Sequence, residues 1–362
     1  MQIGIVGLPN STKTTVFNAL TKSQVETTAY STGQIETNVA IVEVPDPRID
    51  RLSEMFQPRK TTYARIQYTD IAGLRAGIGQ EGGLEGSLLN AIAQNDALLH
   101  VVRAFEDDQV PHPAGEVDPI RDLATLDFEF LFSDLAIVER RMERLARDIS
   151  RGKRDAEQQA NQEEFDLMMQ LKENLEQEIP VRDVPLTPEE EKRIRGYQFL
   201  TAKPVLVVLN VGDEGSNDPS DYTRYAHRQS PTICLRGSLE MEIAQLDKAE
   251  AEDFMIEYGI EEPGLNRLIR LSYEMLGLHS FFTVGEDEVR AWTIPQGADA
   301  VEAAGSIHSD LARGFIRAEV VSYADMIAAG SLPQARKMGK LRLEGKDYIV
   351  QDGDIMNILF NV

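Results

Sequence analysis

Short apolar runs recur along the first 210 residues, and each ends in polar or glycine residues. They lie at residues 3–7, 64–73, 98–105 and 204–210, with segments of helical pattern between them. Near-continuous apolar strands that alternate with helices are typical of a parallel sheet covered on both faces. We therefore predict an α/β domain whose functional residues lie at the C-terminal ends of these strands.

Between residues 124 and 200 the apolar period changes to that of a coiled coil. Apolar side chains step by 4, 3, 4, 3 and 4 residues, at Leu131, Leu135, Val138, Met142, Leu145 and Ile149. A polar stretch at 150–164 follows, and then Met168, Leu171 and Leu175 resume the spacing. This pattern predicts two antiparallel helices joined by a charged tip. The stretch LTPEEE (186–191) predicts a further helix, with Thr187 as N-cap, Pro188 in the first turn and Glu190 closing a capping box.

The last part of the chain is rich in strand patterns. EVRAWTI, FIRAEVV and KLRLEGKDYIVQDGDIMNILFNV have strand character, whereas GADAVEAAGSIHSDLARG is helical. A helix against a small mixed sheet predicts a compact β-grasp module.

Composition narrows the class of protein. The net charge of −23 argues against a protein that coats nucleic acid with its whole surface, although a local basic patch remains compatible. The single cysteine, Cys234, fits a reducing compartment, and no run of eighteen apolar residues predicts a membrane helix. The N-terminus has no basic leader typical of a signal peptide. We expect a soluble cytoplasmic protein.

The stretch GIVGLPNSTKTTVFNAL (4–20) is close to the phosphate-loop pattern G-x-x-x-x-G-K-[ST], with Thr12 in place of the last glycine. In such a loop backbone N–H groups surround phosphates, the lysine (Lys13) reaches the β/γ oxygens, and the next residue (Thr14) holds Mg²⁺. The alternative is an ordinary strand–loop–helix with a surface lysine. Because threonine is β-branched and stiff, we expect weaker nucleotide binding than in a glycine-bearing loop.

Two further motifs follow in the order that a nucleotide site requires. D-x-x-G at the end of the 64–73 run places Asp70 near the metal and the Gly73 N–H near the γ-phosphate. After the 204–210 run, Asn210 and Asp213 keep the frame of the guanine motif N-K-x-D, with Val211 in place of lysine. The loop at 234–240, with Gly237, would flank the base. Taken separately, either motif could be a simple turn.

With these motifs in place, the chain resembles the YchF-type, Obg-related P-loop NTPases of the translation-factor class over its whole length. The stretches GLPNSTKTTVFNALT, EVRAWTIPQGA, GFIRAEV and LEGKDYIVQDGD carry the resemblance. It implies an Obg-like G domain at 1–123 and 201–278, a coiled-coil insertion at 124–200 and a C-terminal TGS domain at 279–362. Members of this family hydrolyse nucleotides, associate with ribosomes, and commonly accept ATP as well as or better than GTP.

The resemblance also implies roles for individual residues. Nucleotide contacts fall on the phosphate loop, at Asn10, Ser11, Thr12, Lys13, Thr14 and Thr15, and the Mg²⁺ ligands on Thr14 and Asp70. Lys13 and His112 carry catalysis, although a loop histidine beside two prolines could equally be structural. Leu74 stands where many GTPases have the glutamine that orients water, so we expect slow turnover. Asn10 implies K⁺ as a second ion.

The chain departs from the family pattern in three places. Thr12 replaces a glycine, and Asp213 stands where the family usually has glutamate. The family's switch threonine is missing. When the family pattern is aligned without gaps, Gln34 occupies its position, and Thr32 and Thr37 match it only if the alignment is shifted. ATP is the first choice by family, but the sequence leaves ATP and GTP open.

A basic stretch lies within this acidic chain, at the predicted hairpin tip. Its cationic residues are Arg140, Arg141, Arg144, Arg147, Arg151, Lys153 and Arg154. They suit the phosphates of ribosomal RNA or a ribosomal protein, or else form ion pairs on a solvated helix face.

Three functions are compatible with these features. The first is a ribosome-associated hydrolase of ATP or GTP, which acts through the hairpin tip and the TGS domain. The second is a nucleotide-sensing ribosome-binding module with little or no hydrolysis. The third is a small-molecule-responsive stress regulator that acts through protein partners.

Overall fold

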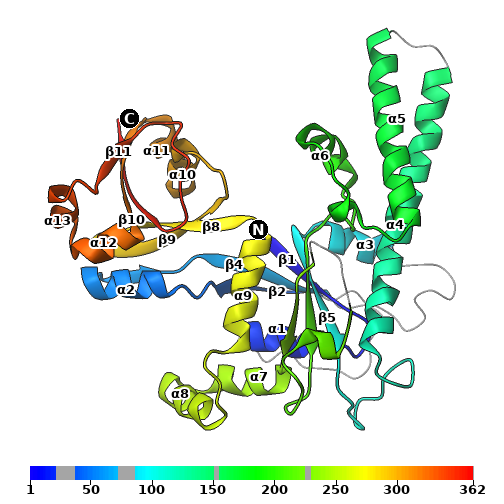
Figure 1. The fold of residues 1–362 in the computed structure, drawn as a ribbon, viewed down its shortest axis with the longest axis horizontal. Helices are drawn as coiled ribbons and strands as arrows, with labels where there is room; N and C mark the ends of the chain where they lie inside the picture. Colours follow the sequence, from blue (N-terminus) through cyan, green and yellow to red (C-terminus); the bar gives the residue numbers. More distant parts are fainter. Residues whose placement is uncertain (22–36, 72–85, 151–154, 225–229, 362) are drawn as a thin grey trace. The chain divides into compact units, whose positions relative to one another are not determined.

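The computed structural model describes residues 1–21, 37–71, 86–150, 155–224 and 230–361. Packing divides the chain into two units, Met1–Ala40 with Gln67–Leu265, and Ile41–Ile66 with Asn266–Val362. Strands β2 (Thr37–Glu43) and β4 (Arg65–Ile71) and helix α9 (Gly264–Met275) each contain a point where the chain passes between units. Within the described residues the structure contains two six-stranded sheets (Figure 1).

The first unit is built on the sheet of order β2-β4-β1-β5-β6-β7. Its remaining strands are β1 (Gln2–Val6), β5 (Ala97–Arg103), β6 (Val205–Asn210) and β7 (Thr232–Leu235). Strand β1 pairs in parallel with β4 and β5, and β6 in parallel with β5 and β7. Every residue of β5 and β6 is buried, so both faces of the sheet are covered, as the continuous apolar runs predicted.

Helices of the first unit cover this sheet and place the loops of the site. Helix α3 (Gly86–Ala93) and the start of α4 (Pro119–Ser150) share a core with β5 and β6 through Leu88, Ile92, Leu123, Leu126 and Phe130. Helix α1 (Lys13–Thr21) packs against β1 and α7 (Gly237–Gln245), and α8 (Lys248–Glu257) follows α7. The C-terminal ends of β1, β4 and β6 thus lead directly into the three predicted motifs.

Helices α4 and α5 (Asp155–Glu176) form the predicted hairpin, and they run side by side in Figure 1. The heptad positions pack on one another, since Leu131, Val138, Leu145, Met168, Leu171 and Leu175 share one buried cluster. Beyond the hairpin lie η1 (Val181–Asp183), α6 (Pro188–Ile194) and η2 (Arg195–Tyr197). The predicted capping box of α6 is confirmed, with Thr187 and Glu190 as its two members. Helix η3 (Pro219–Asp221) lies between β6 and β7.

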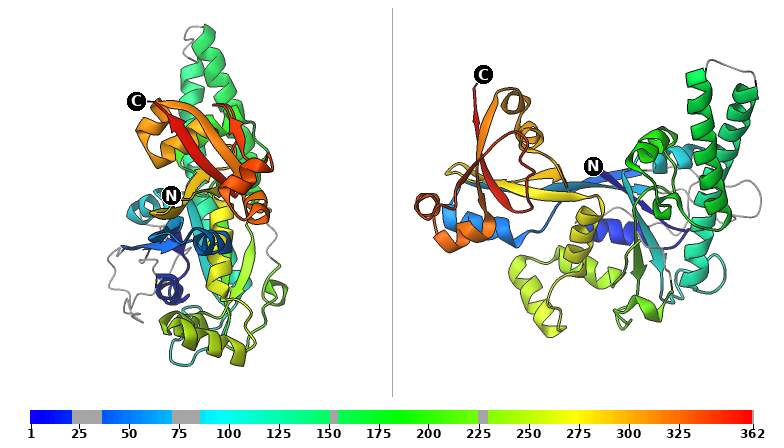
Figure 2. Two further views of the ribbon diagram at one scale, coloured as in Figure 1. Left: turned by 90° about the vertical axis from the view of Figure 1, so that its left-hand side faces the viewer. Right: turned by 45° about the horizontal axis from the view of Figure 1, so that its top comes forward.

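The second unit is a mixed sheet of order β11-β10-β12-β8-β9-β3, seen from two sides in Figure 2. Its strands are β3 (Lys60–Thr62), β8 (Leu278–Thr283), β9 (Glu288–Pro295), β10 (Phe315–Ser322), β11 (Arg342–Glu344) and β12 (Asp354–Phe360). Its shorter helices are α10 (Ala300–Ile307), α11 (Ser309–Arg313), α12 (Tyr323–Ala329) and α13 (Leu332–Lys337). Three alanines of α10 pack into the core of this sheet, which agrees with the predicted helix-on-sheet module.

Residues 41–66 belong to this second unit although they are remote from it in sequence. Helix α2 (Pro47–Phe56) packs against β9, and β3 pairs in parallel with β9. Arg48 joins α2 to the loop before β12, because its guanidinium contacts Asp352 at 2.7 Å and stacks over Phe282. The domain boundaries given above at residues 123, 200 and 278 stay predictions. In the part of the chain that the structure describes, no helix has both the length and the apolar character of a membrane span.

Candidate nucleotide-binding site

The loop between β1 and α1 has the backbone shape of a phosphate loop. Gly7 is required by close approach, because a Cβ there would lie 2.3 Å from the carbonyl oxygen of Val101. Asn10 and Thr12 adopt the left-handed conformation, with φ of 59° and 67°. This path leads into α1, whose first N–H groups have no partner within the helix and favour an anion.

Lys13 folds back over this loop. Its Nζ donates to the carbonyl oxygens of Gly7 at 3.0 Å and Leu8 at 2.9 Å. Burial lowers the pKa of Lys13 to about 8, and the nearby carboxylate of Asp70 opposes that shift. Phosphate oxygens at this position would stabilise the charged form of the ammonium group.

Thr14 and Asp70 meet where a metal ion would be held. The Thr14 hydroxyl donates to Asp70 Oδ2 at 3.1 Å, and the aspartate is only 1% exposed. Burial raises the pKa of Asp70, while the Lys13 charge and the Thr14 hydrogen bond act in the opposite direction. Asp70 Oδ1 is buried and has no hydrogen-bond partner among the described residues. A carboxylate and a hydroxyl in this arrangement fit Mg²⁺, which takes few protein ligands and completes its shell with phosphate and water.

Two other residues of the loop have side chains available to a ligand. Ser11 is buried, and its hydroxyl makes no hydrogen bond within the described residues. Thr15 lies half-buried in the first turn of α1.

Asn210 connects the phosphate loop to the loops that the sequence assigned to the base. Its Nδ2 donates to the Thr12 hydroxyl at 2.6 Å, and its Oδ1 accepts from the Gly237 N–H at 2.8 Å. Arg236, next to Gly237, donates to the carbonyl oxygen of Gly215 at 3.0 Å. The three loops are therefore joined by hydrogen bonds at one end of the sheet.

The other two residues of the base motif differ in exposure. Asp213 is exposed, and its carboxylate makes no hydrogen bond within the described residues. Val211 is 2% exposed and packs in the core with Val6 and Leu209, so its side chain is directed into the protein. Base contacts by Asp213 and Val211 stay predictions.

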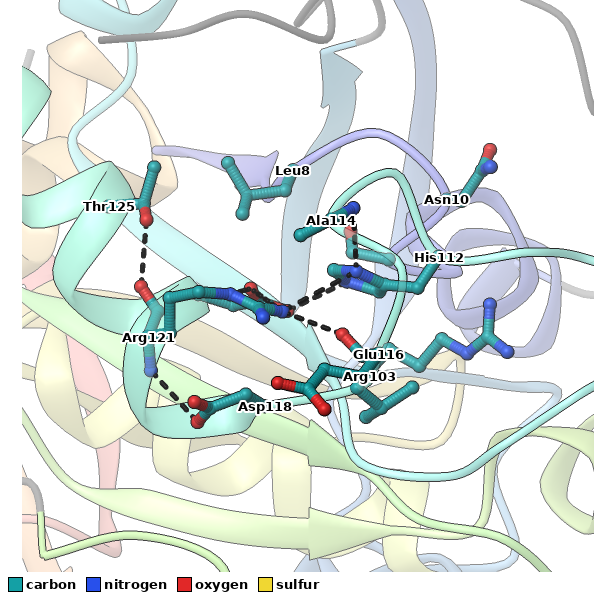
Figure 3. Close-up of polar contacts among 12 residues, drawn as sticks. Leu8, Asn10, Arg103, His112, Ala114, Glu116, Asp118, Arg121 and Thr125 are labelled. Carbon is teal, nitrogen blue, oxygen red and sulfur yellow. Dashed lines mark hydrogen bonds and ion pairs between the residues drawn. The ribbon is translucent and has the colours of Figure 1, made fainter.

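His112 lies on a loop that touches the phosphate loop, since Asn10 Nδ2 donates to the Pro111 carbonyl oxygen at 3.2 Å. Its Nδ1 accepts from the Ala114 N–H at 3.2 Å (Figure 3), and its Nε2 lies 2.9 Å from Asp122 Oδ2. Both ring nitrogens are thus engaged, and Nε2 carries the proton shared with the carboxylate. A catalytic role for His112 stays a prediction, and in this conformation the imidazole holds its own loop.

Two buried polar residues of β5 were not identified from the sequence. Arg103 is 1% exposed, and it donates to the carbonyl oxygens of Phe105 at 2.9 Å and Val110 at 2.6 Å, which shapes the loop before His112. His100 is 2% exposed in the middle of the same strand. The available signal was the presence of two polar residues within an apolar run, LLHVVRAF.

Several predicted residues lie outside the described part of the chain. These are Gly73 and Leu74, the switch positions Thr32 and Gln34, and Arg151, Lys153 and Arg154 of the basic stretch. Thr37 begins β2. On α4, Arg140, Arg144 and Arg147 are exposed, whereas Arg141 is paired with Glu164 at 2.7 Å.

A parallel sheet with a lysine-bearing loop after its first strand and a buried aspartate at the end of β4 defines the class of P-loop NTPases. Residues 2–127 match the family MMR_HSR1, described as 50S ribosome-binding GTPase. Residues 278–361 match YchF-GTPase_C, described as a protein of unknown function.

Similar proteins extend over the whole chain. A Bacillus subtilis protein named ribosome-binding ATPase YchF is 44% identical over 368 residues, with 99% of each chain covered. A protein of the same name from Escherichia coli O157:H7 is 42% identical, again with 99% of each chain covered. The solved structure of the Schizosaccharomyces pombe YchF GTPase superposes with a TM-score of 0.87 at 32% identity, over 99% of this chain and 97% of that one. The chain belongs to the YchF family.

Proposed function

We propose that this protein is a ribosome-associated nucleotide hydrolase that cleaves the β–γ bond of ATP or GTP with Mg²⁺, in the cytoplasm. The observation that carries the proposal is the hydrogen bond between Thr14 and the buried Asp70, whose second carboxylate oxygen has no partner among the described residues. Relatives named ribosome-binding ATPase YchF support both the reaction and the partner.

The residues of the site have distinct roles in this reaction. Lys13 and the N-terminus of α1 neutralise and orient the phosphates, and Thr14 and Asp70 would hold Mg²⁺, which would supply positive charge that offsets the charge of the phosphates. Positioning and charge neutralisation supply most of the catalysis. Turnover without a partner is slow, because leucine stands at position 74 where glutamine would orient the water. K⁺ beside Asn10 is a second ion consistent with this site. His112 takes part only after its Nε2 leaves Asp122.

The test is titration calorimetry with ATP and with GTP in Mg²⁺ and K⁺, followed by phosphate release with and without ribosomes. We expect binding, slow release, and faster release with ribosomes. Lys13→Ala should abolish binding, while Lys192→Ala, a change of an exposed lysine on α6, should leave binding unchanged. Binding without any phosphate release would favour the nucleotide-sensing alternative, and absence of binding would contradict both.

The hairpin is the proposed contact with the ribosome, together with the C-terminal unit. Arg140, Arg144 and Arg147 are exposed and spaced i, i+4, i+7, so they share one face of α4. Reversing Arg144 and Arg147 to Glu should weaken co-sedimentation with ribosomes, and the difference from wild type should be largest at low salt, because salt screens these charges. The matched control reverses Lys192 and Arg195, which are also exposed in this unit. Equal binding by both double variants would exclude the hairpin face as the contact.

A further inference from the structure

Thr12 occupies a backbone conformation that disfavours its side chain. Its φ of 67° lies in the left-handed region, which glycine adopts readily and a β-branched residue rarely adopts. Surrounding contacts must therefore hold Thr12 in place, since the local conformation does not.

The Thr12 hydroxyl supplies those contacts. Its Oγ1 donates to the Ser11 carbonyl oxygen at 2.5 Å and accepts from Asn210 Nδ2 at 2.6 Å. Asn210 is 2% exposed, and its other amide atom, Oδ1, accepts from the Gly237 N–H at the start of α7. A continuous series of hydrogen bonds thus runs from the phosphate loop, through the end of β6, to the loop after β7.

The hydrogen-bonded residues are tightly packed where Asn210 meets Gly237. A Cβ at Gly237 would lie 2.7 Å from Asn210 Oδ1 and 3.0 Å from Nδ2. The Asn210 amide is therefore enclosed between the Thr12 hydroxyl and the Gly237 backbone, and a shift of either one must move the amide or break a hydrogen bond.

We propose that Thr12 is a positioning residue, whose hydroxyl couples the phosphate-binding loop to the base-binding loops through Asn210. A glycine at this position would have the easier backbone conformation but no hydroxyl, so this side-chain link would be lost. The inference rests on the proposed function, because it assumes that a nucleoside triphosphate spans both ends of the site.

The coupling predicts different effects on ligands with and without a base. A nucleoside triphosphate contacts both ends, whereas inorganic tripolyphosphate contacts only the phosphate loop. Thr12→Val keeps the β-branched shape and leaves the buried Asn210 Nδ2 without its acceptor. We expect it to weaken ATP and GTP binding by about five- to tenfold, the effect of one lost hydrogen bond. Tripolyphosphate binding should change less than about twofold, within the scatter of independent sites.

A double-mutant cycle tests the route through Asn210. In an Asn210→Ala background the Thr12→Val change should have no further effect on nucleotide affinity, because its partner is already gone. Thr12→Ser, which keeps the hydroxyl, should restore wild-type affinity. Thr61→Val is the matched control, because it removes a hydroxyl bonded to Ser53 at 2.7 Å in the second unit. Circular dichroism confirms folding, and Thr12→Ala, which also removes the hydroxyl, replaces the valine variant if that variant does not fold.

The outcomes separate this inference from the proposed function. If wild-type protein binds neither nucleotide, the proposed function fails. If wild-type protein binds but Thr12→Val binds equally well, only the coupling is overturned. The coupling is also overturned if Thr12→Val weakens nucleotide and tripolyphosphate equally, or has the same effect with and without Asn210.

Discussion

His100 should make the first unit sensitive to acid. The side chain lies in the middle of β5, between Val6 of β1 and Val207 of β6, and is 2% exposed. Burial, reinforced by the positive charges of Lys13 and Arg182, lowers the pKa of His100 from 6.5 to about 3. The imidazole is therefore neutral in the folded protein down to strongly acidic pH.

The sign and size of the change in stability with pH follow from the difference between the pKa of His100 in the unfolded chain and in the folded protein. The unfolded chain takes up a proton near pH 6.5, while the folded protein does not until about pH 3. The stability from His100 is thus present at pH 7 and is lost as the pH falls from 6.5 toward 3. At pH 5, which is 1.5 units below the unfolded pKa, the loss is about 2 kcal/mol, at 1.36 kcal/mol per unit.

Hydrogen exchange of the β5 and β6 amides at pH 7 and pH 5, corrected for intrinsic exchange rates, measures the opening free energy of this unit. Between pH 7 and pH 5 the opening free energy of the wild-type protein should fall by about 2 kcal/mol more than that of His100→Leu, which has no imidazole to titrate. His308→Asn, a change of an exposed histidine in the second unit, should keep the wild-type response. An equal fall of the opening free energy in wild type and His100→Leu would refute the conclusion that the His100 imidazole stays neutral in the folded protein.

Three further changes test the site and its support. Asp70→Asn should raise the melting temperature of the ligand-free protein, because burial raises the pKa of Asp70 and disfavours its charge, but should abolish stabilisation by Mg²⁺-nucleotide. Thermal melts with and without ligand measure both effects. Asp134→Ala leaves the buried N–H groups of Leu200 and Thr201 without their acceptor and should destabilise the protein by about 2–4 kcal/mol in urea unfolding. Gly237→Ala should weaken nucleotide binding in calorimetry, because its Cβ would meet Asn210, whereas Gly196→Ala, with open space around it, should not.

Local patterns predicted the elements well, because each pattern reports the environment of its own segment. The continuous apolar runs became the buried strands β1, β4, β5 and β6. Most of the heptad positions became the seam of α4 and α5, where Leu131, Val138 and Leu145 are buried and Leu135 and Met142 are partly buried. The helix began earlier than the period change suggested, at Pro119, because its first turns pack on the sheet before the hairpin begins.

The site was predicted less completely, because contacts between distant residues set its details. Lys13, Thr14 and Asp70 meet as the motifs required. The pairing of His112 with Asp122 and the shaping of its loop by the buried Arg103 were not predictable. Neither follows from a periodicity, since each depends on which side chains the fold brings together.

The sequence by itself determined the order of elements, the phosphate loop and the family, because periodicity and motif spacing are written along the chain. Tertiary structure decided that residues 41–66 join the second unit, through pairing of β3 with β9. It also decided the conformation and contacts of Thr12. A threonine in a left-handed conformation is unfavourable alone, and it is held here because Asn210, 198 residues away, donates to its hydroxyl.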